Sequence, residues 1–398
     1  MSKRKLHISA TSINNFKACP MRFRNANVLG IRKEEETEAQ RLGTHWHRIL
    51  DIITRKPESV CARCAKLSAN DPGCSICAGT GFLPKNLMDA VYRELDRIYE
   101  KKTYLDPGVI AVEKNKLLYA LTGYRWYYED QPEEVVTRER RFELSLINPE
   151  SGRALPGVRL VGMIDKIVNW SGRPAIKEHK STSSSVAPDS DYWGHLNLDT
   201  QTKLYLYAAR RLQRDGLLAG WGIKESDPLI NTILYDVFHK PSISPKKLTQ
   251  GESKQFVEDG LYCGQEFGVI QGTGDWIHVN GIQAETEPGK KEGTFAIKET
   301  PEMYGARLLA DIGERPEFYF RCVEMTRTDA EMESFEWELL NIYRSMQNMI
   351  KTDHWYHDEH QCQATFTCDY MPFCYNNIEL SIDEIPDGFK LIFNKEEE

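Results

Sequence analysis

The order of patterns along the chain predicts an α/β protein, with a core of strands and helices and helical additions around it. Helical spacing of apolar residues dominates the first 130 residues. Three alternating, strand-like segments follow between residues 135 and 182, and helices and strands then alternate along the chain up to residue 351. Because a block of strands enclosed by helices has to bury its apolar faces against them, this order indicates a sheet covered by helices.

The N-terminal third is predicted to be helical apart from one insertion. Residues 11–28 carry an apolar face at helical spacing, interrupted near Pro20. Further helices are expected at residues 35–54, 86–102 and 107–129. Residues 57–84 are rich in Cys, Gly and Pro and show no helical period, so we interpret them as a small inserted module.

The sheet is predicted from segments in which apolar and polar residues alternate. The first three are VVTRERRFELSLI, VRLVGMIDKIVNW and RPAIKEHKST, separated by the turn sequences NPESG and SGRP. Then follow a helix at residues 198–214, the strand LINTILYDVFH, a helix starting at Pro301, the strand EFYFRCVEMTR and a helix at residues 329–351. Residues 241–300 are polar and Gly-rich, and we expect them to be irregular.

Composition is that of an ordinary globular chain, with 40% apolar and 28% charged residues. No stretch approaches the roughly 20 apolar residues that a membrane-spanning helix needs. The N-terminal sequence MSKRKLHIS has no apolar core behind its basic residues, so we expect no signal peptide and a cytoplasmic location. This expectation includes a protein that a virus or mobile element encodes, or one that acts in the nucleoid. In such a reducing compartment, ten cysteines favour metal thiolates over disulfides.

Net charge does not exclude a nucleic-acid partner. The chain has 51 basic and 59 acidic residues, which gives −8. A nuclease needs carboxylates to hold divalent cations, and its path for DNA needs only a local basic strip.

Two carboxylates are predicted to meet on neighbouring strands. Asp165 lies on one predicted strand, and Glu178 and Lys180 lie on the next, after a short connection. Two close carboxylates repel each other unless a cation lies between them, so such pairs hold Mg²⁺ or Mn²⁺. Glu178 and Lys180 alternate along a strand and therefore share a face, where the ammonium could orient or deprotonate the attacking water. Taken alone, Glu-x-Lys on a strand is more often a solvent-facing ion pair.

The segment GMID, followed after twelve residues by EHK, resembles the core of the PD-(D/E)xK nucleases. Three further motifs are similar to the RecB-like and AddB-like exonuclease branch of that superfamily. They are SINNFKACPMRFR near the N-terminus, GTHWHRILD with Gly43, His47 and Asp51 in the matching places, and QTKLY with Gln201 and Tyr205. The resemblance implies a mixed central sheet flanked by helices.

The same resemblance assigns roles to residues of this sequence. It implies that His47, Asp165 and Glu178 are metal ligands, with the backbone carbonyl of His179 as a further one, and that Lys180 is the catalytic lysine. Gln201 and Tyr205 would orient Lys180 or touch the DNA backbone. His45 lies two positions from His47 on a helix, so we expect its side chain to point in a different direction from that of His47. Further candidate carboxylates, among which the sequence does not choose, are Glu113, Glu139 and Glu143.

Three cysteines near the C-terminus, Cys362, Cys368 and Cys374, are spaced at six-residue intervals. Several RecB-like nucleases bind a 4Fe–4S cluster with one N-terminal and three C-terminal cysteines, and Cys19 occupies the matching N-terminal position. The spacing of Cys362 and Cys368 departs from the C-x₂-C that the family more often has. Four thiolates suit either structural zinc or an iron–sulfur cluster, and the resemblance favours iron–sulfur.

A second set of thiols lies in the inserted module. Cys61, Cys64, Cys74 and Cys77 form two C-x₂-C pairs, which is the spacing of a zinc ribbon. A segment of 28 residues has too little core to fold alone, and a bound metal would supply the missing stability. A structural role, a DNA contact and the docking of a partner remain open for this module.

These observations together predict a Mg²⁺- or Mn²⁺-dependent DNA exonuclease of the RecB-like iron–sulfur type, acting on single strands or DNA ends in recombination, repair or viral DNA processing. A helicase or recombination protein would be its partner if it degrades duplex DNA processively. The alternatives are a non-catalytic cluster-bearing DNA-binding subunit, a metal-dependent endonuclease, and a redox or zinc-ribbon interaction factor.

The expected segments are 1–56 (helical part of the nuclease domain), 57–84 (zinc-ribbon-like module), 85–130 (helical), 131–240 (catalytic core), 241–300 (irregular insertion) and 301–398 (C-terminal strand, helix and cysteine segment).

Overall fold

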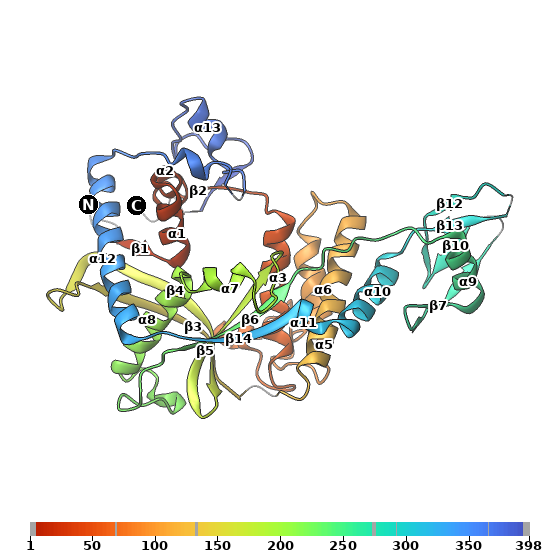
Figure 1. Ribbon diagram of the computed structural model, residues 1–398, viewed down its shortest axis with the longest axis horizontal. Coiled ribbons are helices and arrows are strands. Elements are labelled where there is room, and N and C mark those ends of the chain that lie inside the picture. The colour runs from red at the N-terminus through yellow and green to blue at the C-terminus, as the bar shows by residue number, and fades with distance from the viewer. Residues whose placement is uncertain are drawn as a thin grey trace.

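A mixed six-stranded sheet forms the centre of the molecule (Figure 1). The computed structural model describes residues 5–67, 70–131, 134–272, 276–291, 293–364 and 366–392. The sheet has the order β1-β4-β5-β6-β14, and β3 also pairs with β4. Its strands are β1 (Leu6–Ile8), β3 (Glu134–Ile147), β4 (Ala154–Trp170), β5 (Arg173–Thr182), β6 (Thr232–His239) and β14 (Phe320–Thr326). Strands β1 and β4, and strands β5 and β6, are parallel, whereas the other pairs are antiparallel. The predicted mixed α/β class is therefore confirmed.

The hairpin of β4 and β5 follows from its two-residue turn. Ser171 and Gly172 both have positive φ, 51° and 78°, and Trp170 pairs with Arg173 across the turn. Positive φ at both central residues is the geometry that matches the twist of the flanking strands, and glycine adopts it without a steric penalty. Because a tight turn fixes the register of a hairpin, this turn sets which residues of β4 and β5 face each other.

Helices cover the sheet in two groups, each with its own apolar cluster. Helices α8 and α12 pack with α1 and the sheet around one cluster, and α3, α5, α6 and α10 enclose the other. Figure 1 shows α8 and α12 on one side of the view and α3, α5, α6 and α10 on the other. The bounds are α1 (Ala10–Ala18), α2 (Pro20–Phe23), η1 (Arg24–Val28), α3 (Glu38–Ile53), α4 (Ala62–Lys66), α5 (Leu87–Glu100), α6 (Pro107–Tyr127), α7 (Asp191–Leu196), α8 (Thr200–Arg214), η2 (Ala219–Trp221), α10 (Pro301–Glu314), α11 (Pro316–Tyr319), α12 (Asp329–Thr352), η3 (Glu359–Gln361) and α13 (Met371–Tyr375).

The segment expected to be irregular, residues 241–300, instead contains a helix and several short strands, and this expectation was wrong. The elements are α9 (Gln250–Asp259), β7 (Leu261–Tyr262), β8 (Gln265–Glu266), β9 (Val269–Gln271), β10 (Ile277–Val279), β11 (Ile282–Gln283), β12 (Thr286–Pro288) and β13 (Phe295–Ile297). They enclose a small apolar cluster that includes Phe256, Ile277 and Ile297. Strands of two or three residues are too short to show an alternating pattern, so they could not be predicted from the sequence.

The C-terminal tail returns to the N-terminal helices. Strand β15 (Phe389–Leu391) pairs with β2 (Ile31–Lys33), and the hydroxyl of Tyr370 donates to the carbonyl of Ile31 at 2.6 Å. Figure 1 shows α13 next to α2 and β2. Among the described residues, no helix is long and apolar enough to cross a membrane.

Candidate active site

The two carboxylates lie where strands β4 and β5 separate. Their ladder ends at the pair Lys166 and Lys177, and the next facing positions are Asp165 and Glu178. The backbone N–H of His179 donates to Oδ2 of Asp165 at 3.3 Å. Beyond this point β5 continues alongside β6, with Glu178 opposite Tyr235. The opening between β4 and β5 therefore has one carboxylate on each side.

Helix α3 brings His47 to this opening. Nδ1 of His47 lies 3.3 Å from Oδ2 of Asp165. A Cβ atom on Gly43 would lie 3.0 Å from Oγ of Ser181, so the glycine allows α3 to approach β5 closely. The ring of His45 instead packs edge-on against Tyr99 at 4.9 Å, away from the carboxylates, as its spacing predicts.

Lys180 is the centre of a polar network. Its Nζ lies 3.4 Å from Oε1 of Glu178 and 3.2 Å from Oδ2 of Asp199, and it donates to Oε1 of Gln201 at 2.6 Å. Nε2 of Gln201 donates in turn to the hydroxyl of Tyr205 at 3.0 Å. Gln201 and Tyr205 are one turn apart on α8, so one face of this helix fixes the direction of the lysine. Burial would lower the pKa of Lys180, but the charges of Glu178 and Asp199 raise it.

The charges of the site leave room for a cation. Burial and the charge of Asp165 raise the pKa of Glu178 to about 8. Among the described residues, no hydrogen-bond partner reaches the buried Oε2 of Glu178. Burial would also raise the pKa of Asp165, but the hydrogen bond and charge of His47 lower it. A buried, unpartnered carboxylate oxygen beside a second carboxylate and an imidazole is a donor set that suits Mg²⁺ or Mn²⁺.

The side chain of His179 points toward Asp236 on β6, and its ring lies edge-on to that of His47 at 6.2 Å. Its Nδ1 lies 3.1 Å from Oδ2 of Asp236 on β6, and both residues are buried. Burial and the charge of Lys166 lower the pKa of His179, which favours a neutral imidazole. Its Nε2 has no hydrogen-bond partner among the described residues, and the metal role of the backbone carbonyl stays a prediction.

Two acidic residues at the site went unrecognised or unchosen in the sequence. Asp199 caps α8 by accepting from the N–H of Gln201 at 3.0 Å while it contacts Lys180. An Asp directly before the helix that starts at Thr200, two residues ahead of the QTKLY motif, is a capping signal that could have identified it. Glu139 lies opposite Asp165 in the β3–β4 ladder, between the pairs Arg138–Lys166 and Arg140–Ile164. The other two candidate carboxylates pair elsewhere, Glu113 with Arg41 and Glu143 with Arg159, and Asp51 of the helical motif pairs with Arg55.

Comparison with known families agrees with this geometry. The sequence model of the PD-(D/E)XK nuclease superfamily matches residues 7–375. This chain belongs to the PD-(D/E)XK nuclease superfamily. Membership implies a metal-dependent phosphodiesterase that acts on nucleic acid. A search of curated protein sequences gives no match. The structure brings the motif residues of this nuclease domain together, and their individual catalytic roles remain predictions.

The matched range of the nuclease domain also contains the inserted cysteine module. The Sγ atoms of Cys61, Cys64, Cys74 and Cys77 all lie within 4.8 Å of one another, and all four residues are buried. Two of the separations are 3.9 Å, between Cys61 and Cys74, and 3.4 Å, between Cys64 and Cys77. Zinc–sulfur bonds of about 2.3 Å in a tetrahedron place the sulfur atoms about 3.8 Å apart, so the four thiols fit a single ion.

The N–H groups next to Cys77 favour the thiolate form of this one residue, whereas burial raises the pKa of Cys61. Burial would raise the pKa of Cys77, but backbone hydrogen bonds from Gly81 and Gly79, with contributions from Cys64 and Cys74, lower it to about 7. Both glycines have positive φ, 80° at Gly79 and 79° at Gly81, which other residues rarely adopt. The glycines therefore allow the backbone to turn its N–H groups toward the sulfur.

The second cysteine set lies at the junction of the two ends of the nuclease domain, but within the described part of the chain no three of its four sulfur atoms lie within 4.8 Å of one another, unlike those of the inserted module. The backbone N–H of Asp358 donates to Sγ of Cys19 at 3.5 Å, and the N–H of Cys368 donates to the carbonyl of Cys362 at 2.8 Å. Burial, together with the charges of Cys368, Cys19 and Cys362, raises the pKa of Cys374 to about 11. The N-terminal cysteine and the three C-terminal ones are thus electrostatic neighbours.

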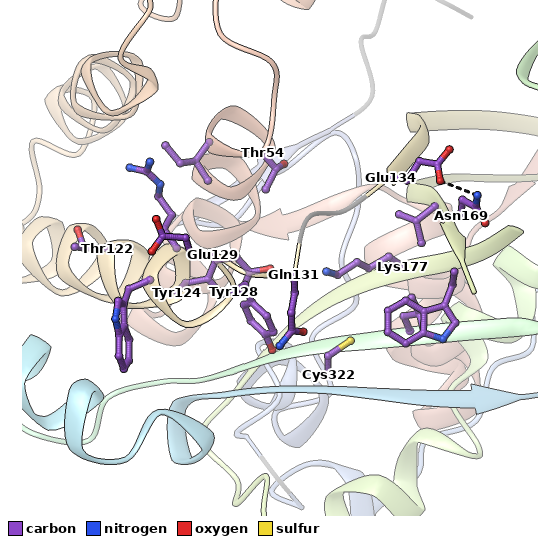
Figure 2. Close-up of a pocket in the computed structure, with 16 residues that line it drawn as sticks. Thr54, Thr122, Tyr124, Tyr128, Glu129, Gln131, Glu134, Asn169, Lys177 and Cys322 are labelled. Atoms are coloured by element: carbon purple, nitrogen blue, oxygen red, sulfur yellow. Dashed lines mark hydrogen bonds between the residues drawn. The ribbon is translucent and has the colours of Figure 1, made fainter. Parts of the chain in front are cut away.

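A separate cavity of about 760 Å³ lies near the turn end of the β4–β5 hairpin (Figure 2). It is lined by the end of α6, by β4 and by Lys177, which precedes Glu178 on β5 and so faces the opposite side of the sheet. Figure 2 shows Lys177, Tyr128 and Gln131 around its centre, and Glu134 bonded to Asn169 at its edge. His47, Asp165, Glu178 and Lys180 do not line it, so it is distinct from the candidate active site.

Proposed function

We propose that this chain is a metal-dependent DNA exonuclease of the RecB-like iron–sulfur type, which cleaves phosphodiester bonds at DNA ends and favours single strands. The observation that carries the proposal is the position of Lys180. Its ammonium touches Glu178 and is held by Gln201, next to Asp165 and His47. A surface ion pair would need neither a fully buried Glu178 nor the support of Gln201.

The residues of the site divide into ligands and groups that orient them. His47, Asp165 and Glu178 would hold the cation, with the carbonyl of His179 as a further ligand. A bound Mg²⁺ or Mn²⁺ supplies Lewis-acid polarisation of the phosphate and lowers the pKa of water. Lys180 donates hydrogen bonds from a fixed position and can orient the attacking water toward phosphorus.

Gln201 and Tyr205 would fix the rotamer of Lys180. Gln201 accepts from the ammonium and donates to the tyrosine hydroxyl, so each side chain restrains the next. Tyr205 is buried against the ring of Phe142 at 6.1 Å, which anchors the chain of hydrogen bonds in the apolar core. This arrangement supports an orienting role over direct contact with the DNA backbone.

Cys19, Cys362, Cys368 and Cys374 would bind a 4Fe–4S cluster that joins the two ends of the domain. The loop between Cys19 and Cys362 is longer than 340 residues. The entropic cost of closing a loop rises only as about (3/2)RT ln n, so a metal cluster can offset it. Contacts between the N-terminal helices and the tail, such as the N–H of Met21 donating to the carbonyl of Tyr356 at 3.2 Å, support this clamp.

Digestion of labelled DNA tests the activity. We expect Mn²⁺- or Mg²⁺-dependent degradation of linear strands with free ends, while circular strands and strands with blocked ends stay intact. Cleavage of circles would identify an endonuclease instead. Binding of DNA without any cleavage would identify a non-catalytic subunit.

Anaerobic purification tests the cluster. We expect a brown protein with about four iron atoms at the C-terminal cysteines and zinc in the inserted module. A colourless protein with zinc at both thiol sites would refute the iron–sulfur assignment while leaving the nuclease assignment intact.

A further inference from the structure

We propose that the inserted cysteine module, residues 57–84, holds the catalytic helix α3 in position, with Glu94 as the positioning residue between them. Metal binding at the four cysteines would then control how well the nuclease site binds its own divalent cation. This inference rests on the proposed function, because it concerns the ligand His47.

Both cysteine pairs of the module are directed toward one buried carboxylate. Arg63 lies between Cys61 and Cys64, and its Nη1 is 3.9 Å from Oε2 of Glu94. Ser75 lies between Cys74 and Cys77, and its hydroxyl donates to the same oxygen. Arg93, beside Glu94 on α5, donates to the carbonyl of Ser75 at 2.8 Å. Each C-x₂-C pair therefore contributes one side chain to Glu94.

Glu94 connects this module to the catalytic helix. Its side chain is fully buried, and Nε of Arg48 donates to its Oε1. Arg48 directly follows His47 on α3. Arg97 completes the group with bonds of 2.9 Å and 2.7 Å to the two oxygens of Glu94. A buried carboxylate with several guanidinium partners is costly to disrupt, so it fixes the positions of the elements that carry them.

The module also reaches the strand next to Asp165. Nζ of Lys66, on α4 of the module, lies 2.8 Å from Oε2 of Glu139. Glu139 stands opposite Asp165 in the β3–β4 ladder and has a positive φ of 45°. An ordinary residue adopts that conformation only where its surroundings hold it. The module thus contacts the neighbours of two proposed ligands, His47 and Asp165, on two different elements.

This arrangement depends on the metal because the module has little other structure. In the part of the module that the structure describes, residues 57–67 and 70–84, the one helix is α4, five residues long, and the cysteine side chains form much of the buried surface. Without an ion the four thiols would lose the bonds that hold the two C-x₂-C pairs together. Arg63 and Ser75 would then leave Glu94, and Arg48 would lose the fixed partner that orients it.

Two matched variants separate this positioning role from a general loss of stability. Glu94→Gln removes the charge at the junction. Glu113→Gln is the control, because Glu113 is an equally buried carboxylate that bonds Arg41 of the same helix, at 2.6 Å, but does not touch the module. Arg48→Gln is a third variant, whose side chain is 44% exposed and therefore tolerates substitution.

Mn²⁺ binding to the DNA-free protein, measured by calorimetry, is the primary readout, with bound zinc and iron counted for each variant. We expect Glu94→Gln and Arg48→Gln to bind Mn²⁺ about 10- to 100-fold more weakly, as is usual when the support of a metal ligand is removed. Glu113→Gln should stay within about twofold of wild type. Removing zinc from wild type with a chelator should weaken Mn²⁺ binding similarly, and should add little in Arg48→Gln because both act through the same contact.

Cleavage of a 5′-labelled linear single strand is the second readout. In Glu94→Gln, kcat should fall about 10- to 100-fold with KM nearly unchanged, and excess Mn²⁺ should restore part of it. Equal Mn²⁺ affinities in Glu94→Gln and Glu113→Gln would overturn the inference, even if both cleave DNA. A wild type that binds Mn²⁺ but cleaves no strand would overturn the proposed function instead, and the comparison of Mn²⁺ affinities would still decide the role of Glu94.

Discussion

Replacing Gly162 with alanine should disturb both the core and the proposed catalytic residue Lys180. A Cβ atom at this position would lie 2.5 Å from Cζ of Phe142 and 3.2 Å from Cε1 of Tyr205. Carbon atoms normally pack at about 3.5–4.0 Å, so the phenylalanine ring has to move by about 1 Å. Overpacking of a core costs about 1–3 kcal/mol, and we expect Gly162→Ala to lower the free energy of unfolding by that amount.

The same substitution should slow cleavage, because Tyr205 orients Gln201 and Gln201 holds Lys180. A misplaced catalytic group can cost about 100-fold in rate, and we expect a loss of about tenfold for this smaller shift. Denaturant unfolding and initial cleavage rates measure the two effects.

Phe142→Leu provides the internal check. It makes space beside Gly162, so the loss in the free energy of unfolding of the double variant should be about 1 kcal/mol smaller than the sum of the two single losses. Additive effects, or a Gly162→Ala protein as stable and active as wild type, would refute this account of the packing.

Three further predictions concern stability. Burial and the charge of Lys102 lower the pKa of His45 to about 4, below the value of about 6.5 in an unfolded chain. The contribution of His45 to stability is therefore complete above about pH 6.5 and is lost as the pH falls toward 4. From pH 7 to pH 5, the free energy of unfolding in urea should fall by about 1–2 kcal/mol more in wild type than in His45→Gln. Arg41→Met leaves Glu113 buried without its cation and should lower the free energy of unfolding by about 3–5 kcal/mol in the same assay. Adding Glu113→Gln should restore part of that loss, and no recovery would contradict the pairing. Limited proteolysis should cut the C-terminal tail of Cys19→Ser as readily as that of Cys374→Ser, and a Cys19→Ser protein as resistant as wild type would count against the clamp.

The β4–β5 hairpin could be predicted from sequence because its determinants are local. The turn at Ser171 and Gly172 and the alternation on both sides of it fix the register, and the register places Asp165 beside Glu178. The spacing of Gln201 and Tyr205 on one helix face is likewise a local property. For these elements the pattern in the chain and the tertiary structure agree.

Other features depend on contacts between segments that are distant in sequence, and local sequence patterns could not predict them. Glu139 was one of three undecided carboxylates until the pairing of β3 with β4 placed it opposite Asp165. Glu94 has an ordinary place on an amphipathic helix, and only the packing of the inserted module against α3 and α5 reveals its partners. The short strands of residues 241–300 form through tertiary packing, which outweighs their weak local pattern.

The central claim is that Asp165, Glu178 and Lys180 form the site of phosphodiester cleavage. The most direct measurement compares wild type with Lys180→Ala on labelled linear single strands in Mn²⁺, after circular dichroism has shown that both are folded. We predict Mn²⁺-dependent degradation by wild type and a loss of at least about 100-fold in the variant. Cleavage at the wild-type rate by folded Lys180→Ala would contradict the assignment of this site.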